Sequence, residues 1–501
     1  MDLGLNTFLM SFVCLHFQVV QHVMKYLTKR DLLSCRLVCM LWNVEAGVYI
    51  RKHEKITLFS ASQKYGEQTL ESYLSLGKTQ VFQGSHKLPP YSHFSFQAQK
   101  PNAQFRPDSM HVFLQNYGHS IRHIEIFFPE NSSLSPQNFL AFLHTGMPNL
   151  KSIHFINLPR ALTQSSFRSS SIKETNKSVT QLRIDRPLEL RRSWKPPFLE
   201  DLFAFLPGLT QYELWTWNAC EDDPSKPYLI SLSMEQRKHL KELRPGCIGE
   251  NLGRSLTFLN LNLSKLFLPV LNRDMTANTL EMLLASQRST LTELQINCSS
   301  LQDSGKLLTF PNMSMLNVLH VIIAFPCDKN NDFKVNNVPP IDYTAQFPVL
   351  RSLKIELSVY MDSEIIKYFF SGKSCQSSLT ELDISFKGFR DEKFIPNVSN
   401  MFPSLTTLRL DGYGNKILHH ICLCLPDLVH LEVRMIFGFN VDDQLTGISK
   451  NVCGQLRMSD ELTAIALPEN DIVNWEKVEL SPSLCSLTSE FEYEFRINCH
   501  S

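Results

Sequence analysis

The HHICLC stretch at 419–424 gathers the side chains that come closest to a chemical site in this sequence. His419, His420, Cys422 and Cys424 are residue types that bind zinc, but structural zinc sites pair two ligands a few residues apart and repeat the pair at a distance. On one helix these four side chains point in different directions. The spacing therefore favours an ordinary helix with buried cysteines and exposed histidines, and we expect no metal site.

The sequence lacks the short motifs that usually mark a catalytic or nucleotide-binding site. It contains no P-loop, no GxGxxG loop, no HExxH helix and no GxSxG elbow. The most basic stretch, RPLELRRSWKPP at 186–197, has no interleaved aromatic residues on a defined element and is typical of a solvated loop. We therefore expect no catalytic residues, no cofactor, no nucleic-acid partner, and a protein that is not itself an enzyme.

The composition is that of a folded protein with reduced cysteines. Of 501 residues, 43% are hydrophobic, and 49 basic side chains balance 49 acidic ones, so the net charge favours neither nucleic acid nor acidic membranes. The thirteen cysteines are scattered singly, which is typical of the cytosol or nucleus. The apolar N-terminal stretch has no Lys or Arg before Lys25, and no run is long and clean enough to span a bilayer. We expect a cytoplasmic or nuclear protein that does not bind membranes.

One apolar phrase, L-x-x-L-x-L, recurs along most of the chain. SLTELDI at 378–384 is the clearest copy, and STLTELQI at 289–296 and SLTTLRL at 404–410 match it closely. The spacing between most successive copies is in or near the range of roughly 20 to 30 residues, which is typical of a repeat made of one strand and one helix. The eleven copies begin at Ile121, Leu150, Val179, Leu209, Leu256, Leu291, Leu316, Leu350, Leu379, Leu405 and Leu428.

Helices are predicted between the phrases. SPQNFLAFLHTG at 135–146 has Ser135 at the N-cap, a proline at the first helical position and a glycine at its end. DSEIIKYFFSG at 362–372 and NKILHHICLCLP at 415–426 have similar boundaries. A unit of one strand and one helix cannot bury its own apolar face. The units are therefore expected to stack into an α/β solenoid, with a curved parallel sheet and outer helices.

This pattern resembles the leucine-rich repeat over about residues 115–440. That family usually has Asn or Cys after each strand, where the side chains form a hydrogen-bonding ladder. The present sequence departs from the family there, with Leu158, Ser264, Ser299, Lys387, Tyr413 and Ile436 at the corresponding positions.

In such a repeat the leucines of each strand form the core, and the residues that alternate with them form an open face. The predicted face is polar and mixed in sign, which suits a protein segment better than a polyanion. Trp215 is either an exposed interface anchor or a side chain packed against the insertion at 218–228. The predicted substrate-binding residues are Arg183, Glu213, Trp215, Asn260, Gln295, Lys354, Glu381, Asp383, Arg409 and Glu432.

Residues 12–54 hold more apolar side chains than a small helical segment can bury alone. DLLSCRLVCMLW at 31–42 is predicted to be one helix with Asp31 at its N-cap, between a helix over 17–27 and a short helix over 43–54. Such a segment must either dock on the first repeats or be completed by a second protein.

These residues resemble the F-box, a module that docks on the Skp adaptor of cullin–RING ubiquitin ligases. The match includes Tyr26-Leu27, Asp31-Leu32-Leu33, Val38-Cys39 and Trp42, whereas His16 and Gln18 stand where the family usually has Pro and Glu. The resemblance implies a receptor subunit that binds the Skp adaptor, and through it the cullin, while the repeats capture a protein substrate. The implied adaptor-binding residues are Leu15, Val19, Val20, Val23, Leu27, Leu32, Leu33, Val38, Cys39 and Trp42.

The predicted organisation has four parts. An F-box at 12–54 precedes a linking strand and helix segment with a first degenerate repeat at 55–115, leucine-rich repeats at 116–440, and a degenerate repeat or cap at 441–501. Two alternatives stay open. The chain could be a leucine-rich-repeat scaffold with a non-functional F-box, or a secreted repeat receptor that uses its six Asn-x-Ser sequons.

Overall fold

The computed structural model describes the chain in separate stretches, which fall into two compact units. Unit 1 comprises Met1–Trp217 and Ser231–His239, and unit 2 comprises Asn218–Ile230 and Leu240–Ser501. The described residues are 18–59, 68–80, 91–97, 107–128, 146–157, 175–185, 202–215, 229, 232–272, 274–298, 309–323, 340–357, 368–371, 375–386, 394–411, 421, 423–425 and 427–434.

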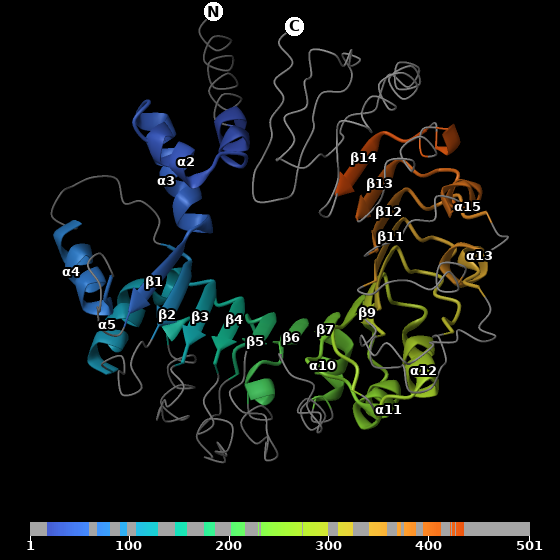
Figure 1. The fold of residues 1–501 in the computed structure, drawn as a ribbon. Helices are drawn as coiled ribbons and strands as arrows, with labels where there is room; N and C mark the ends of the chain where they lie inside the picture. The colour runs from blue at the N-terminus through green and yellow to red at the C-terminus, as the bar shows by residue number, and fades with distance from the viewer. Residues whose placement is uncertain are drawn as a thin grey trace, which may run out of the picture. The chain divides into compact units, whose positions relative to one another are not determined.

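Unit 1 contains a parallel sheet whose strands follow one another in chain order. Neighbouring strands from β1 to β6 pair in parallel, and α4 and α5 lie on one side of the first strands (Figure 1). The elements are α2 (Lys29–Cys35), α3 (Met40–His53), β1 (Lys55–Phe59), α4 (Leu70–Gln80), β2 (His93–Gln97), α5 (Pro107–Tyr117), the 3₁₀ turn η2 (Gly118–Ser120), β3 (His123–Phe127), β4 (Ser152–Ile156), β5 (Gln181–Asp185), β6 (Gln211–Trp215) and α10 (Met234–His239).

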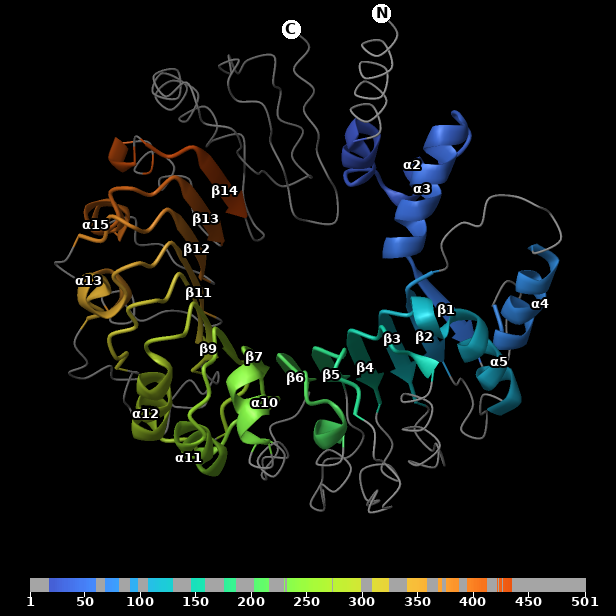
Figure 2. The ribbon, with the colours of Figure 1, turned by 180° about the vertical axis from the view of Figure 1, so that it is seen from behind.

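Unit 2 repeats the arrangement with a second run of parallel strands, β7 to β14. Its helices cover one face of that sheet, as the views from both sides show (Figures 1 and 2). The elements are β7 (Glu242–Arg244), α11 (Glu250–Phe258), β8 (Lys265–Leu268), α12 (Ala277–Gln287), β9 (Glu293–Asn297), β10 (Val318–Ile323), α13 (Tyr343–Gln346), β11 (Ser352–Leu357), β12 (Glu381–Phe386), α15 (Phe394–Met401), β13 (Thr407–Asp411) and β14 (His430–Arg434).

The repeated leucines form the core, as the sequence predicts. All eleven residues that begin the phrases are at most 3% exposed. Along β10 and β11 buried and half-buried residues alternate, so that Leu319 and Leu353 pair in the core row while His320 and Lys354 pair on the opposite face. Burying one apolar row per strand against the helices contributes about 1.5–3 kcal/mol for each large side chain, which makes this row the main source of stability.

One predicted strand is wrong. Residues 255–261 belong to the end of α11 and the residues after it, and the strand of this repeat is β8, Lys265–Leu268. Leu252, Leu256 and Leu259 are buried at helical spacing, because L-x-x-L-x-L also fits one face of a helix. Asn260, predicted on the open face of a strand, instead follows the helix with φ of 48°, a left-handed conformation that suits asparagine after a helix end.

Threonine hydroxyl groups just before the strands connect several successive repeats of the described chain. Just before β5 and β6, Thr180 donates to Lys151 O at 3.3 Å and Thr210 donates to Thr180 O at 3.1 Å. In unit 2, Thr292 before β9 donates to Ser264 O at 2.9 Å in the same way. In these three cases the hydroxyl belongs to the residue before the strand and donates to a carbonyl of the previous repeat, whereas the expected asparagine position follows the strand.

The front of the chain forms three helical segments, but not with the predicted boundaries. The stretch 31–42 is two helices, because α2 ends at Cys35 and α3 begins at Met40. The N-cap is Thr28 rather than Asp31. The Thr28 hydroxyl accepts from Asp31 N–H, and the Asp31 carboxylate accepts from Thr28 N–H, which is a capping box.

Several predicted elements lie wholly or largely outside the described residues. They include Leu15, His16, most of the helix predicted at 135–146, and residues 441–501. Of the helix predicted at 362–372, residues 368–371 are described, and 368–370 are helical.

Candidate functional site

The helical segment at residues 18–53 has a small apolar core of its own. Val20, Met24, Leu32, Cys35, Ala46 and Ile50 are buried together, and Leu27, Leu41 and Trp42 pack against them half-exposed. Gln21 Nε2 donates to the buried Glu45 carboxylate at 2.9 Å, which joins the first helical segment to α3. Val20 and Leu32, predicted to bind the adaptor, are therefore residues that hold this segment together, because their side chains are already covered.

The same segment leaves two apolar stripes exposed. In the first stripe, Val19, Val23 and Tyr26 are spaced four and three residues apart. In the second, Leu33 lies on α2, and Leu37 and Val38 lie in the turn between α2 and α3. Their exposures are 52%, 37% and 76% for the first stripe and 47%, 88% and 65% for the second. Val19, Val23, Leu33 and Val38 were predicted to bind the adaptor, and Cys39 is exposed beside them.

These two stripes concentrate the exposed apolar surface of the described chain. They supply six of the thirteen large hydrophobic side chains that are exposed in the described residues. A monomeric protein rarely exposes neighbouring large apolar residues without a partner. The stripes therefore form a candidate docking face.

The open face of unit 1 carries a network of charged and polar side chains. The parallel register places Ser95, Glu125, His154, Arg183 and Glu213 in one row across β2 to β6. Within it, Glu125 accepts from Lys55 Nζ at 3.0 Å and from Ser95 Oγ at 2.7 Å.

His154 lies between two carboxylates of this face. Its Nδ1 is 3.2 Å from Glu125 Oε2, and its Nε2 is 2.8 Å from Asp185 Oδ2. Burial acts to lower the pKa of His154, but the hydrogen bonds with Asp185 and Glu125 outweigh it and the pKa is raised. Hydrogen bonds with His154, Ser95 and Lys55 in turn lower the pKa of Glu125 to about 2, against the effect of burial. The two carboxylates therefore favour the protonated form of the His154 ring over its neutral form.

The open face of unit 2 brings most of the predicted substrate-binding residues together. Gln295, Lys354, Asp383, Arg409 and Glu432 share one row across the paired strands, with His320 of β10 among them. These residues come from repeats far apart in the sequence, and the register alone makes them neighbours. The register places these residues on one face of unit 2, and their role in binding stays a prediction.

Charges on this second face are also paired with one another. Lys354 Nζ is 2.8 Å from Glu356 and 3.9 Å from Asp383, and Arg409 contacts Glu381 at 2.5 Å. Glu356 also lies 3.1 Å from His320, whose pKa is lowered chiefly by burial.

Two of the predicted substrate-binding residues have side chains outside the described part of the structure. Trp215 ends β6 and Glu432 lies on β14, and only their backbone positions are described. The two alternatives for Trp215 therefore both stay open.

The predicted set omitted Asp185 and Glu356, which contact its members Arg183 and Lys354, and it omitted Glu125, which contacts His154. Glu125 lies in SIRHIEI, a copy of the phrase at 120–126, and the same period-2 rule points to it. Asp185 and Glu356 each lie two residues beyond a predicted one, so continuing the alternation would have found them as well.

His419, His420 and Cys422 lie outside the described residues, so the expectation for HHICLC stays a prediction. Elsewhere in the described chain, no three His, Cys, Asp or Glu side chains are arranged to hold a metal ion. Among the described helices, none is both long and apolar enough to cross a membrane.

Comparison with known protein families finds no model that matches this chain, and comparison with curated proteins finds no match either.

Proposed function

We propose that this chain is the substrate-recognition subunit of a cullin–RING ubiquitin ligase. In this proposal the helical segment acts as an F-box that docks on the Skp adaptor, and the strand faces act as the concave surface of leucine-rich repeats that captures a protein substrate. The chain itself performs no bond chemistry. It raises the effective concentration of substrate lysines near the charged ubiquitin.

The observation that carries the proposal is the placement of the two apolar stripes. They lie on a segment whose interior is already filled by its own buried residues. The exposed leucines and valines are therefore not needed to fill the core of the segment. Burying them in a groove of a partner would contribute about 0.8 kcal/mol to binding for each methylene group. Helices that present apolar anchors at three- and four-residue spacing are typical of helix-in-groove recognition.

The faces of the two sheets support the receptor half of the proposal. Each presents a row of polar side chains on parallel strands, with carboxylates and cations at fixed positions. The mixed signs suit a folded protein or peptide substrate with its own paired charges.

The test is binding of the purified Skp adaptor to the wild-type chain and to Leu33→Ser/Leu37→Ser, measured by isothermal titration calorimetry. Both leucines are exposed, so the variant should keep the helical core. We expect one-to-one binding by the wild type and an affinity lower by a factor of ten or more in the variant, because central apolar anchors dominate such interfaces.

A matched control is Phe258→Ser, which removes an 81% exposed apolar side chain from unit 2. It should bind the adaptor like the wild type. No binding by the wild type would instead favour a leucine-rich-repeat scaffold without a ligase.

Leu32 is unsuitable for this test, because its truncation would remove part of the core and cost about 2–5 kcal/mol of stability.

A further inference from the structure

The part of the chain that carries the docking face has an excess of positive charge, unlike the chain as a whole. Residues 18–43 contain four basic residues and one acidic residue, Asp31, in a protein whose charges otherwise balance. The Asp31 carboxylate is engaged by the Thr28 hydroxyl at 2.6 Å and by Thr28 N–H. Residues 18–43 are therefore positive at their surface, with the Asp31 carboxylate occupied in capping a helix.

Basic residues are interspersed with the apolar stripes along the sequence. Arg30 and Leu33 are three residues apart, as are Leu33 and Arg36, so both arginines share the helical face of that leucine. Lys25 directly precedes Tyr26 of the other stripe. Lys25, Arg30 and Arg36 are all exposed, and none of them forms an ion pair with another described residue.

This differs from the cations of the open strand faces. Lys55, Arg183 and Lys354 each contact at least one carboxylate of their own unit. Lys25, Arg30 and Arg36 contact no carboxylate among the described residues, and Arg36 Nε donates to the neutral Asn43 Oδ1 at 3.0 Å. A partner that brings carboxylates to Lys25, Arg30 and Arg36 would therefore meet charges that no internal pair has already satisfied.

We propose that the partner of this face has an apolar groove bordered by acidic side chains, and that Lys25, Arg30 and Arg36 pair with that acidic border. This rests on the proposed function, and it names the chemistry of the adaptor surface that the segment fits. The apolar stripes supply the affinity, and the basic residues accelerate and orient the encounter.

The test is the association rate constant of the purified Skp adaptor with the full chain at several salt concentrations, measured by stopped-flow fluorescence. We compare the wild type with Arg30→Glu/Arg36→Glu. At low salt we expect the variant to associate at least ten times more slowly, and the wild-type rate to fall as salt rises. The dissociation rate should change much less.

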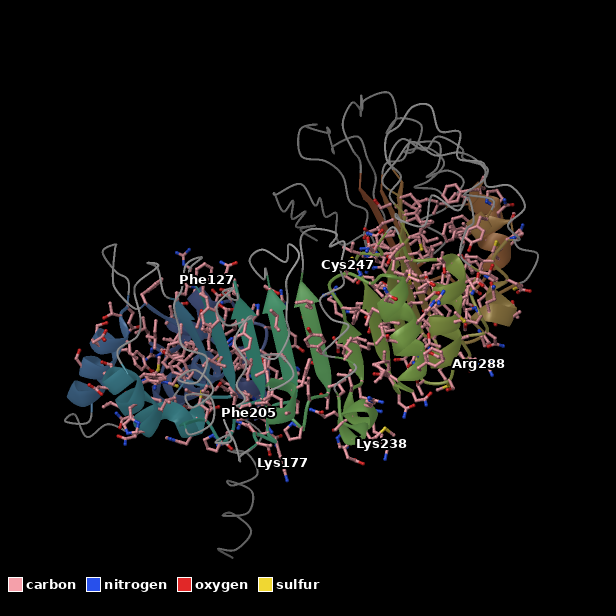
Figure 3. All side chains as sticks on the ribbon, turned by 90° about the horizontal axis from the view of Figure 1, so that it is seen from below. Phe127, Lys177, Phe205, Lys238, Cys247 and Arg288 are labelled. Atoms are coloured by element: carbon pink, nitrogen blue, oxygen red, sulfur yellow. The ribbon has the colours of Figure 1, made fainter. Side chains whose placement is uncertain are left out.

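The matched control is Lys151→Glu/Lys177→Glu, which makes the same change in charge at two exposed lysines of unit 1 outside the helical segment (Figure 3 labels Lys177). It should associate like the wild type. Equal slowing by both variants would overturn the proposal, because the effect would then come from net charge.

Two further outcomes also overturn it. The adaptor could bind the wild type and both variants with the same association rate constant at every salt concentration. The proposal of an acidic border on the partner would then be wrong, and the proposed function would stand. If the adaptor does not bind the wild type, both proposals fail. Binding of the wild type to phosphatidylserine vesicles but not to the adaptor would assign the basic residues to a membrane surface.

Discussion

His154 of unit 1 and His320 of unit 2 are each the third residue of their strand and lie on the open face of their sheet. Their side chains are equally accessible, at 19% exposed. Their pKa values nevertheless move in opposite directions, raised for His154 and lowered for His320.

Burial lowers the pKa of both rings and is the largest effect in each case, so the difference must come from their neighbours. His154 has a carboxylate at each ring nitrogen, from the strands on either side. His320 has one, Glu356, which it shares with the Lys354 ammonium group. The repeat thus sets where a side chain stands, and the residues on neighbouring strands set its charge.

The largest effect should come from the core, and it should not distinguish the two units. Leu182 and Leu353 are each the second residue of their strand, and both are at most 1% exposed. Leu182→Ala and Leu353→Ala should each lower the free energy of unfolding by about 2–5 kcal/mol, because each removes a fully buried side chain and leaves a cavity. Urea denaturation followed by circular dichroism measures the loss. A loss below about 1 kcal/mol in one variant would show that the two cores are not equivalent.

A smaller effect should separate the two histidines directly. In NMR titrations of the imidazole nitrogens, His154 should take up its proton above pH 6.5 and His320 below it. Protonated His154 stabilises the fold, so its contribution is full below pH 6.5 and is lost as pH rises through its folded pKa. Folded His320 resists protonation, so its contribution has the opposite sign and stability is lost as pH falls below 6.5.

The control is Asp185→Asn, which removes one of the two carboxylates at His154 and should lower the pKa of His154 while leaving that of His320 unchanged. Equal pKa values for the two histidines in the wild type would contradict the comparison.

Glu125 adds a second pH dependence to unit 1, at acid pH. Its pKa is lowered to about 2, so its stabilising contribution is present above pH 4.5 and is lost as pH falls toward 2.

The sequence predicts those features of the two sheets that depend only on the alternation of side chains along a strand. Alternation along a strand places Lys354 on the open face and Leu353 in the core, because successive side chains point to opposite sides. The same rule failed at Leu256, since the phrase also satisfies helical spacing and local sequence does not decide between the two.

The pairing around His154 depends on information that a single strand lacks. Glu125 and Asp185 are 29 and 31 residues from His154 in the sequence, and only the parallel register brings both carboxylates to the ring. The break between α2 and α3 is similar. Residues 36–39 contain no Gly or Pro, so the turn is imposed by packing of Leu32, Cys35 and Ile50 rather than by a local signal.

Replacement of Arg183 should have the smallest effect on stability. It should also widen the difference between the pKa values of His154 and His320. Arg183 is 44% exposed and contacts Asp185 at 3.0 Å and Glu213 at 3.7 Å. Arg183→Gln should change the free energy of unfolding by no more than about 1 kcal/mol, because exposed ion pairs are weak. It should nevertheless raise the pKa of His154 further, since the guanidinium charge acts to lower it.

The matched variant is Arg409→Gln on the face of unit 2, which removes a cation of similar exposure that pairs with Glu381. It should leave the NMR titration of His154 unchanged. A fall in the pKa of His154 in Arg183→Gln would mean that the arginine holds Asp185 in place for the ring. A rise would mean that Arg183 and His154 compete for the Asp185 carboxylate, so that weakening the bond from Arg183 strengthens the bond from His154.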